Sequence, residues 1–103
     1  MTRDAFSLSL TGNHPPQNIS EPLKAMWYDA KNDWEEAHNI AQNIHSPEGS
    51  WIHAYLHRKE GDHVNASYWY HRAGRPVPRS TTLPEEWQEI TEELLKGGYD
   101  LQR

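Results

Sequence analysis

The sequence repeats one short pattern at an interval that few folds use. An aspartate is followed four residues later by an alanine at Asp33 and Ala37, and again 29 residues further on at Asp62 and Ala66. Self-similarity at a fixed interval of roughly 20 to 50 residues is typical of chains that stack one supersecondary unit on the next. Aspartate favours the N-cap of a helix, and alanine is the strongest helix former and lets two helices approach closely. The repeat therefore predicts paired helices packed side by side.

Helix start and stop signals continue along the rest of the chain at the same scale. Asp33 and Glu36 form a capping box, and Pro47 follows Ser46 at the first helical position, where proline is favoured. Gly61 is suited to end a helix in the left-handed conformation. The residues predicted to cap five helices are Ser20, Asp33, Ser46, Asp62 and Thr82. Because the loops between them are short, neighbouring helices are expected to be antiparallel.

Helical-wheel arithmetic at about 100° per residue predicts which faces are covered. Trp34 and Ile40 share an apolar face of the helix that starts at Asp33, whereas His38 falls on the opposite face, which is expected to point to solvent. The helix that starts at Asp62 carries Val64 and Tyr68 nearly opposite its other apolar residues. A helix that is apolar on two sides is expected to have neighbours on two sides.

We predict a single all-α domain made of two antiparallel helical hairpins and a C-terminal capping helix. The segment GRPVPRS cannot continue a helix and is predicted to be an extended connector. Gly97 and Gly98 are predicted to end the last helix, and the alternation FSLSLT suits a short strand in the N-terminal arm. The predicted boundaries are an irregular arm at 1–20, a domain at 21–96 with hairpins at 21–45 and 46–74, the connector at 75–81 and the capping helix at 82–96, and a tail at 97–103.

The composition argues against several classes of function. There is no cysteine, so the chain has no disulfide framework and no thiolate chemistry. The net charge of −5 argues against general nucleic-acid binding. The opening MTRDAFSLSL has an early acid and no apolar run long enough for a signal peptide or a membrane span, so we expect a cytoplasmic protein without membrane contact. No phosphate-binding loop, nucleophile elbow or Ser/His/Asp arrangement is present, and nothing in the sequence requires an enzyme.

The stretch GDHVNASYWYHRAGRPVP resembles the second half of a tetratricopeptide repeat. Three segments within residues 22–78, WYDAKNDWEEAHNIAQ, WIHAYLHRKEGD and YWYHRAGRP, are also similar to a group of small uncharacterised bacterial proteins with this helical-hairpin pattern. The residues that match the tetratricopeptide pattern are Gly61, Asp62, Ala66, Tyr70, Ala73 and Pro78.

The resemblance implies a protein- or peptide-binding module. Tetratricopeptide-like domains bind peptide segments in a concave groove lined by the first helix of each hairpin, without a cofactor. Carried over to this chain, the groove residues are Met26, Trp51, Tyr55, Arg58 and Lys59. An aromatic and basic groove of this kind suits an acidic or aromatic segment. Two hairpins also leave a partly apolar end that a second copy could cover in a homodimer.

Charge is distributed unevenly along the chain, and two interpretations are open. Between residues 57 and 79 the bases outnumber the acids by three, whereas the segment PEEWQEITEE carries five acids. Arg72, Arg75 and Arg79 extend the basic groove residues into a patch that could receive a phosphate or an acidic peptide. Alternatively, the acidic final helix docks across the basic residues and satisfies both charge runs.

His53, His57 and Glu60 lie on one helical stripe at positions i, i+4 and i+7. The tetratricopeptide pattern prefers leucine and tyrosine at the two histidine positions, so the chain departs from the family there. Two histidines one turn apart can chelate Zn²⁺ or Ni²⁺, and the glutamate could complete three ligands. Imidazole can also perform acid–base work. In the remaining interpretation the histidines only fill the hairpin and hydrogen-bond to neighbours such as Tyr70 or Asp29.

Three functions therefore follow from the sequence. The first is a protein- or peptide-binding module that needs no metal or cofactor. The second is an enzyme or metal-dependent protein that uses His53, His57 and Glu60. The third is a binder of a small anionic ligand or a sugar, because the chain has many aromatic residues and a cluster of basic ones.

Overall fold

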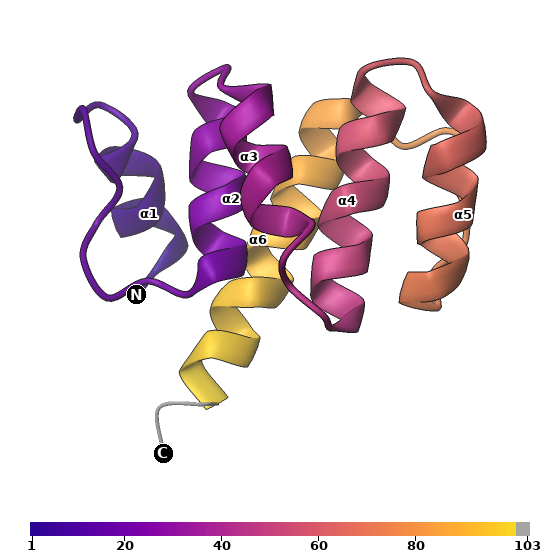
Figure 1. Cartoon of the computed structure of the whole chain (residues 1–103). Coiled ribbons are helices and arrows are strands. Elements are labelled where there is room, and N and C mark those ends of the chain that lie inside the picture. Colours follow the sequence, from indigo (N-terminus) through magenta and orange to yellow (C-terminus); the bar gives the residue numbers. More distant parts are fainter. Residues whose placement is uncertain (101–103) are drawn as a thin grey trace.

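The chain is all-α. A computed structural model describes residues 1–100, with side chains to residue 96, and this part of the chain contains six helices and no strand (Figure 1). The helices are α1 (Arg3–Ser9), α2 (Glu21–Ala30), α3 (Trp34–Ala41), α4 (Pro47–Lys59), α5 (His63–Ala73) and α6 (Leu83–Asp100).

The predicted capping residues are confirmed. The side chains of Ser20, Asp33, Ser46 and Asp62 each accept a hydrogen bond from the backbone N–H three residues later, at the starts of α2 to α5. At the start of α6 the bonds are reciprocal, because Thr82 Oγ1 accepts from the N–H of Glu85 while Glu85 Oε1 accepts from the N–H of Thr82. Each cap satisfies a backbone donor that has no partner inside its helix.

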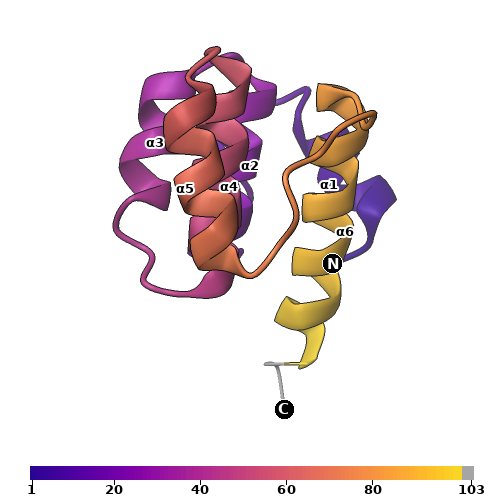
Figure 2. The ribbon, with the colours of Figure 1, turned by 90° about the vertical axis from the view of Figure 1, so that its right-hand side faces the viewer.

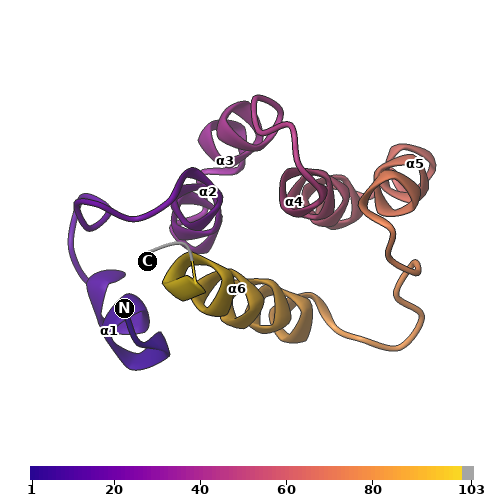
Figure 3. The same cartoon turned by 90° about the horizontal axis from the view of Figure 1, so that it is seen from below.

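Helices α2 to α5 form an arc of two pairs, and α6 packs against this arc. The pairs α2–α3 and α4–α5 each pack closely, and α3 packs on α4, so the four helices follow one another around the arc. Helix α6 lies on the inner side of this arc, against α2 and α4, with α1 on its other flank (Figure 3). The connector between α5 and α6 runs back along the molecule from the end of α5 to the start of α6 (Figure 2).

The hydrophobic core lies where the pairs meet α6. Trp27 of α2, Ile52 and Leu56 of α4, and Ile90 of α6 are all almost completely buried. The indole N–H of Trp87 donates to the carbonyl oxygen of Met26 at 3.1 Å, so this aromatic residue of α6 both packs and bonds across the interface. The last helix is therefore an integral part of the core.

The arm predicted to be irregular contains helix α1. Thr2 caps it through the N–H of Ala5, and Phe6 is completely buried with its ring 6.2 Å from that of Trp87. Phe6 is the only buried residue of α1, so the segment has no apolar stripe that sequence periodicity could detect, and its serine alternation pointed to a strand instead. Helix α1 is therefore stabilised by its contact with α6 and not by an amphipathic pattern of its own.

Two other expectations also need correction. Val64 and Tyr68 of α5 are 84% and 53% exposed, so α5 has a neighbour on one side only and its second apolar face is solvent-exposed. Helix α6 continues to Asp100 rather than ending at residue 96. Glycine lowers helix stability relative to alanine by about 1 kcal/mol but keeps its backbone N–H, so Gly97 and Gly98 do not force the helix to end.

In the part of the chain described, no helix has the length and apolar character needed to cross a membrane.

Close packing at the start of α4 generates a stability prediction. A methyl group added at Gly49 would lie 2.7 Å from Cβ and 2.8 Å from Cγ2 of Ile44, closer than carbon atoms approach without rearrangement. We expect Gly49→Ala to lower the free energy of unfolding by about 1 to 3 kcal/mol, because the loop before α4 must shift. Chemical denaturation with Gly12→Ala as the control checks this, since the added methyl there meets only one atom, at 3.5 Å. A stabilised Gly49→Ala protein, as helix propensity alone would give, would contradict the packing argument.

Candidate functional site

The predicted peptide groove is covered by α6. Met26, Trp51 and Tyr55, which were expected to line an open surface, are 0%, 5% and 2% exposed. At the groove, this arrangement agrees with the second interpretation of the charge pattern, in which the acidic final helix docks on the basic residues. Arg58 and Lys59 also lie here, and both are engaged in ion pairs with carboxylates of the same chain.

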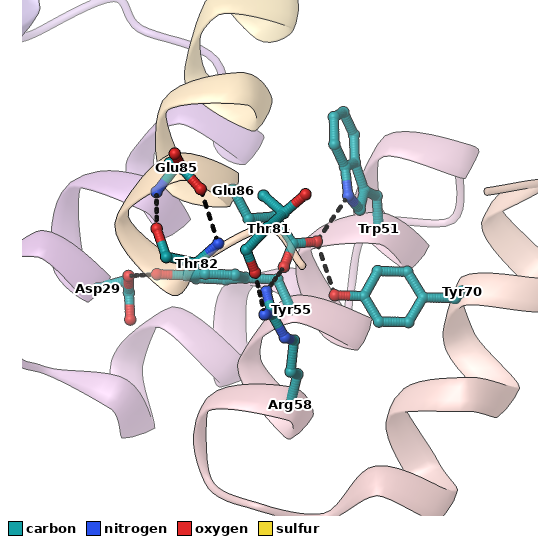
Figure 4. A network of polar contacts seen from close by, with 9 residues as sticks. All are labelled: Asp29, Trp51, Tyr55, Arg58, Tyr70, Thr81, Thr82, Glu85 and Glu86. Atoms are coloured by element: carbon teal, nitrogen blue, oxygen red, sulfur yellow. Dashed lines mark hydrogen bonds and ion pairs between the residues drawn. The ribbon is translucent and has the colours of Figure 1, made fainter. Parts of the chain in front are cut away.

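Glu86 of α6 occupies the centre of the groove with its side chain 1% exposed. Its Oε2 atom accepts from the Trp51 indole at 3.1 Å and from the Tyr70 hydroxyl at 2.6 Å, and its Oε1 atom accepts from Arg58 at 2.6 Å (Figure 4). Arg58 also donates to the carbonyl oxygen of Thr81, just before α6. The charge and both oxygens of this carboxylate are thus satisfied by donors from α4 and α5.

A second buried carboxylate, Asp29 of α2, ties α2 to α4. It accepts from the Tyr55 hydroxyl at 2.8 Å and from the Lys59 ammonium at 2.9 Å. Burial, together with the nearby carboxylate of Asp29, raises the pKa of Tyr55 above its ordinary value, so the hydroxyl is a stable donor. Burial and the Glu86 carboxylate raise the pKa of Tyr70 in the same way.

The three arginines predicted to form a patch have different neighbours. The Arg75 guanidinium lies 3.4 Å from the centre of the Trp51 ring. Arg72 lies over Tyr68 and Trp69 of α5, and Arg79 is exposed on the connector. Only the Arg58 side of the predicted basic surface meets the acidic helix.

The predicted histidine stripe is part of a larger cluster. His38 of α3 joins His53 and His57 of α4, and one ring nitrogen from each lies within 4.8 Å of the other two. The Nε2 atoms of His38 and His53 are 3.1 Å apart. His53 is buried, with 8% of its surface exposed, whereas His38 and His57 are half-buried. The cluster therefore has one buried member and two members within reach of solvent.

Glu60 has a different place from the one predicted. Its carboxylate lies 2.7 Å from Nδ1 of His57, on the outer side of the ring. A proton on Nδ1 is stabilised by this contact, which leaves the lone pair of His57 on Nε2. Glu60 thus orients a histidine instead of sharing a site with His53. The expected partners of the histidines, Tyr70 and Asp29, bind Glu86, Tyr55 and Lys59 instead.

Two tryptophans flank the cluster. Trp34 stacks on His38 with 8° between the planes, and Trp69 stacks on His53 with ring centres 4.1 Å apart. The Trp34 indole N–H donates to the carbonyl oxygen of Leu56 at 2.8 Å, which fixes the ring between α3 and α4. Stacking on Trp34 and Trp69 restricts the rotation of the His38 and His53 rings.

The surroundings of His38 and His53 favour neutral imidazoles. Burial, with the positive charge that His38 and His57 would add, lowers the pKa of His53 from 6.5 to about 4. Burial and His57 also lower the pKa of His38. Neutral rings carry a free lone pair, so at neutral pH these two histidines offer nitrogen ligands without loss of a proton from an imidazolium.

The sequence pattern did not indicate His38 as a site residue, because the helical wheel placed it on an exposed face. The wheel describes one helix and carries no information on how closely the next helix passes. Helix α4 packs on α3 beside this face, which brings His38 against His53. The one signal available was the spacing of His38 one turn after Trp34, a pair that the structure stacks.

A cavity of about 320 Å³ adjoins the cluster at His53. It lies between the end of α3, the start of α4 and the last turns of α5, and His53 and Trp69 belong to its lining. A second cavity, of about 500 Å³, lies beside Asp29 and Lys59 under the start of α6. Of the two, only the first shares a residue with the histidine cluster.

Comparison with known proteins gives no match to a family model, to a curated protein or to a solved structure.

The buried carboxylate of Glu86 generates a second stability prediction. We expect Glu86→Ala to lower the free energy of unfolding by about 3 to 5 kcal/mol, because Arg58, Trp51 and Tyr70 lose their shared acceptor. Urea denaturation is the measurement. Glu89→Ala, an exposed glutamate of the same helix, is the matched control and should change stability by no more than about 0.5 kcal/mol. Equal effects of the two substitutions would show that Glu86 does not hold α6 in place.

The lowered pKa of His53 predicts a pH dependence of stability in the presence of EDTA. Between the ordinary value of 6.5 and about 4, the unfolded chain binds a proton that the folded protein excludes. The free energy of unfolding should therefore fall as the pH drops below 6.5, by up to about 3 kcal/mol from this residue. Denaturation at several pH values should show a shallower decline for His53→Gln than for the wild type. Parallel curves would mean that His53 takes up its proton in the folded state.

Proposed function

We propose that this protein binds a divalent transition-metal ion, with Zn²⁺ as the best fit, through His38, His53 and His57. The observation that supports this function is the convergence of three imidazoles, from two different helices, with one ring nitrogen of each within 4.8 Å of the others. Histidines that merely fill space are not required to bring their ring nitrogens this close together.

The spacing of the ring nitrogens suits a small cation. Ligand nitrogens about 2.0 to 2.1 Å from a tetrahedral zinc ion lie roughly 3.3 Å from each other. The Nε2 atoms of His38 and His53 are 3.1 Å apart. One of these rings carries its proton on Nε2 and donates it to the other. To bind an ion, that ring would carry the proton on Nδ1 instead, which frees both Nε2 lone pairs. His57, whose ring stacks on that of His53, would have to turn and move closer to complete the site.

The contacts that orient the three histidines have the form that zinc sites use. A metal-binding histidine commonly donates its other ring N–H to a carboxylate, which fixes the ring and increases its basicity. The contact of His57 Nδ1 with Glu60 at 2.7 Å supplies this pair. Trp34 and Trp69 hold the other two rings by stacking. Each of the three proposed ligands therefore has a residue that orients it.

The ligand set also selects the class of metal. Three neutral imidazoles favour Zn²⁺, Co²⁺, Ni²⁺ and Cu²⁺, whereas Mg²⁺ and Ca²⁺ require oxygen ligands. No carboxylate belongs to the three-histidine group among the residues described. A site of three protein ligands leaves a coordination position for water or another ligand, as catalytic zinc sites do.

Peptide binding in the groove ranks second as a proposal. The binding of Glu86 by three donors supports a groove that accepts a carboxylate from a helix. An outside segment would, however, have to displace α6 and uncover Ile90 and Leu94, which are buried. Metal binding needs no such rearrangement.

Zinc titration of the purified, EDTA-treated protein tests the proposal. We expect one ion per chain and a melting temperature that rises with zinc, because an ion that binds only the folded state stabilises it. Glu60→Gln should weaken zinc binding by roughly 10- to 100-fold, as loss of an outer-shell partner does. His38→Ala or His57→Ala should weaken it more.

His71→Ala, an exposed histidine of α5, is the control and should leave zinc affinity unchanged. His38 and His57 are half-buried, and circular dichroism of each variant establishes that it is folded before its affinity is compared. Equal affinities of wild type and His38→Ala/His57→Ala, or no binding by the wild type at millimolar zinc, would rule out the site.

A further inference from the structure

The cavity beside His53 has a lining that favours negative charge. Its residues come from α3, from the turn before α4, from α4 and from α5, and none of them is an aspartate or glutamate. The lining thus carries no negative charge, although the chain as a whole has a net charge of −5. The polar side chains of the lining are those of Gln42, His45, Ser46, Ser50, His53 and Arg72.

Arg72 supplies a positive charge at the edge of this cavity, and its side chain is solvent-exposed. Its guanidinium lies 5.4 Å from the centre of the Trp69 ring and 5.8 Å from that of Tyr68, and it donates to the Tyr68 hydroxyl at 3.2 Å. Among the ion pairs of the described residues, none includes Arg72. A guanidinium held by aromatic rings and not paired with a carboxylate is suited to bind an oxyanion through two parallel N–H donors.

The histidine cluster and the cavity meet at His53. The ring of His53 contributes Nε2 to the contact with His38 and also belongs to the wall of the cavity, where Trp69 stacks on it. A ligand in the cavity is thus in contact with a residue that would hold the metal. The volume of about 320 Å³ lies at the small end of the roughly 300 to 1,000 Å³ typical of small-molecule sites.

We infer that the metal held by His38, His53 and His57 takes a small oxyanion, a carboxylate or a phosphate, from this cavity as its fourth ligand, with Arg72 binding the anion's remaining oxygens. This inference rests on the proposed metal site. It adds the chemical class of the ligand, which three histidines alone do not specify. An oxyanion satisfies both partners at once, because an anionic oxygen is a good zinc ligand and a good acceptor for a guanidinium.

The test uses the full chain loaded with one equivalent of Co²⁺, whose visible absorption reports the atoms bound to the metal. Inorganic phosphate and acetate are titrated separately into loaded and metal-free protein. We expect saturable spectral changes with at least one anion, and calorimetry should give an affinity for the loaded protein at least about tenfold above that of the metal-free protein. By linkage the same anion should increase the affinity for the metal by the same factor. A response to phosphate alone identifies a phosphate-type ligand, and a response to acetate a carboxylate.

Matched arginine variants separate this inference from the proposed function. Arg72→Ala should weaken anion binding about tenfold or more and leave the affinity for Co²⁺ without anion unchanged. Arg79→Ala removes the same charge from an exposed position on the connector and should bind the anion as the wild type does. Histidine-dependent metal binding with no anion effect, or equal anion affinities for the two arginine variants, would overturn this inference and leave the metal site standing. Absence of histidine-dependent metal binding would overturn both.

Discussion

A carboxylate can be buried only where a cation balances its charge and donors form hydrogen bonds with its oxygen atoms. This requirement at Glu86 determines where α6 lies. Its two oxygens are bound by Trp51 and Arg58 of α4 and by Tyr70 of α5, so α6 is placed in one register along the arc of helices. Ile90, one turn further on, is then placed over the core. Apolar packing supplies most of the driving force for folding but is not directional, whereas these polar contacts are directional.

The two polar clusters inside the fold differ in how far they are satisfied. The Glu86 carboxylate accepts hydrogen bonds from three donors, one of them cationic. A ligand could add no bond of comparable strength to it. The histidine cluster contains three rings and one short contact between two of them, and burial keeps His53 in its neutral form at neutral pH. The first arrangement accounts for structure, and the second is the one at which we propose a ligand. This contrast, more than residue type, is the reason for placing the proposed site there.

Much of the fold could be predicted from local signals, and the site could not. Caps at Ser20, Asp33, Ser46, Asp62 and Thr82 depend on neighbours three residues away, and the structure confirms all five. Phe6 and His38 acquire their surroundings from helices distant in sequence, so no period within their own segments could reveal them. Arg58 was recognised as a basic groove residue, but which acid of α6 would pair with it depended on the path of the connector. His53, His57 and Glu60 were found as a set, although the structure gives Glu60 a supporting place.

The position of α6 in the chain also bears on how the molecule is made. The bonds that α6 forms with Trp51, Met26 and Arg3 span 35, 61 and 89 residues, so none of them can form until that helix has left the ribosome. The two hairpins, whose contacts are local, can form earlier. During synthesis they present the aromatic and basic inner surface of the arc without its cover. A nascent chain of this protein therefore has, for the time needed to add the last helix, an open surface that the finished molecule closes.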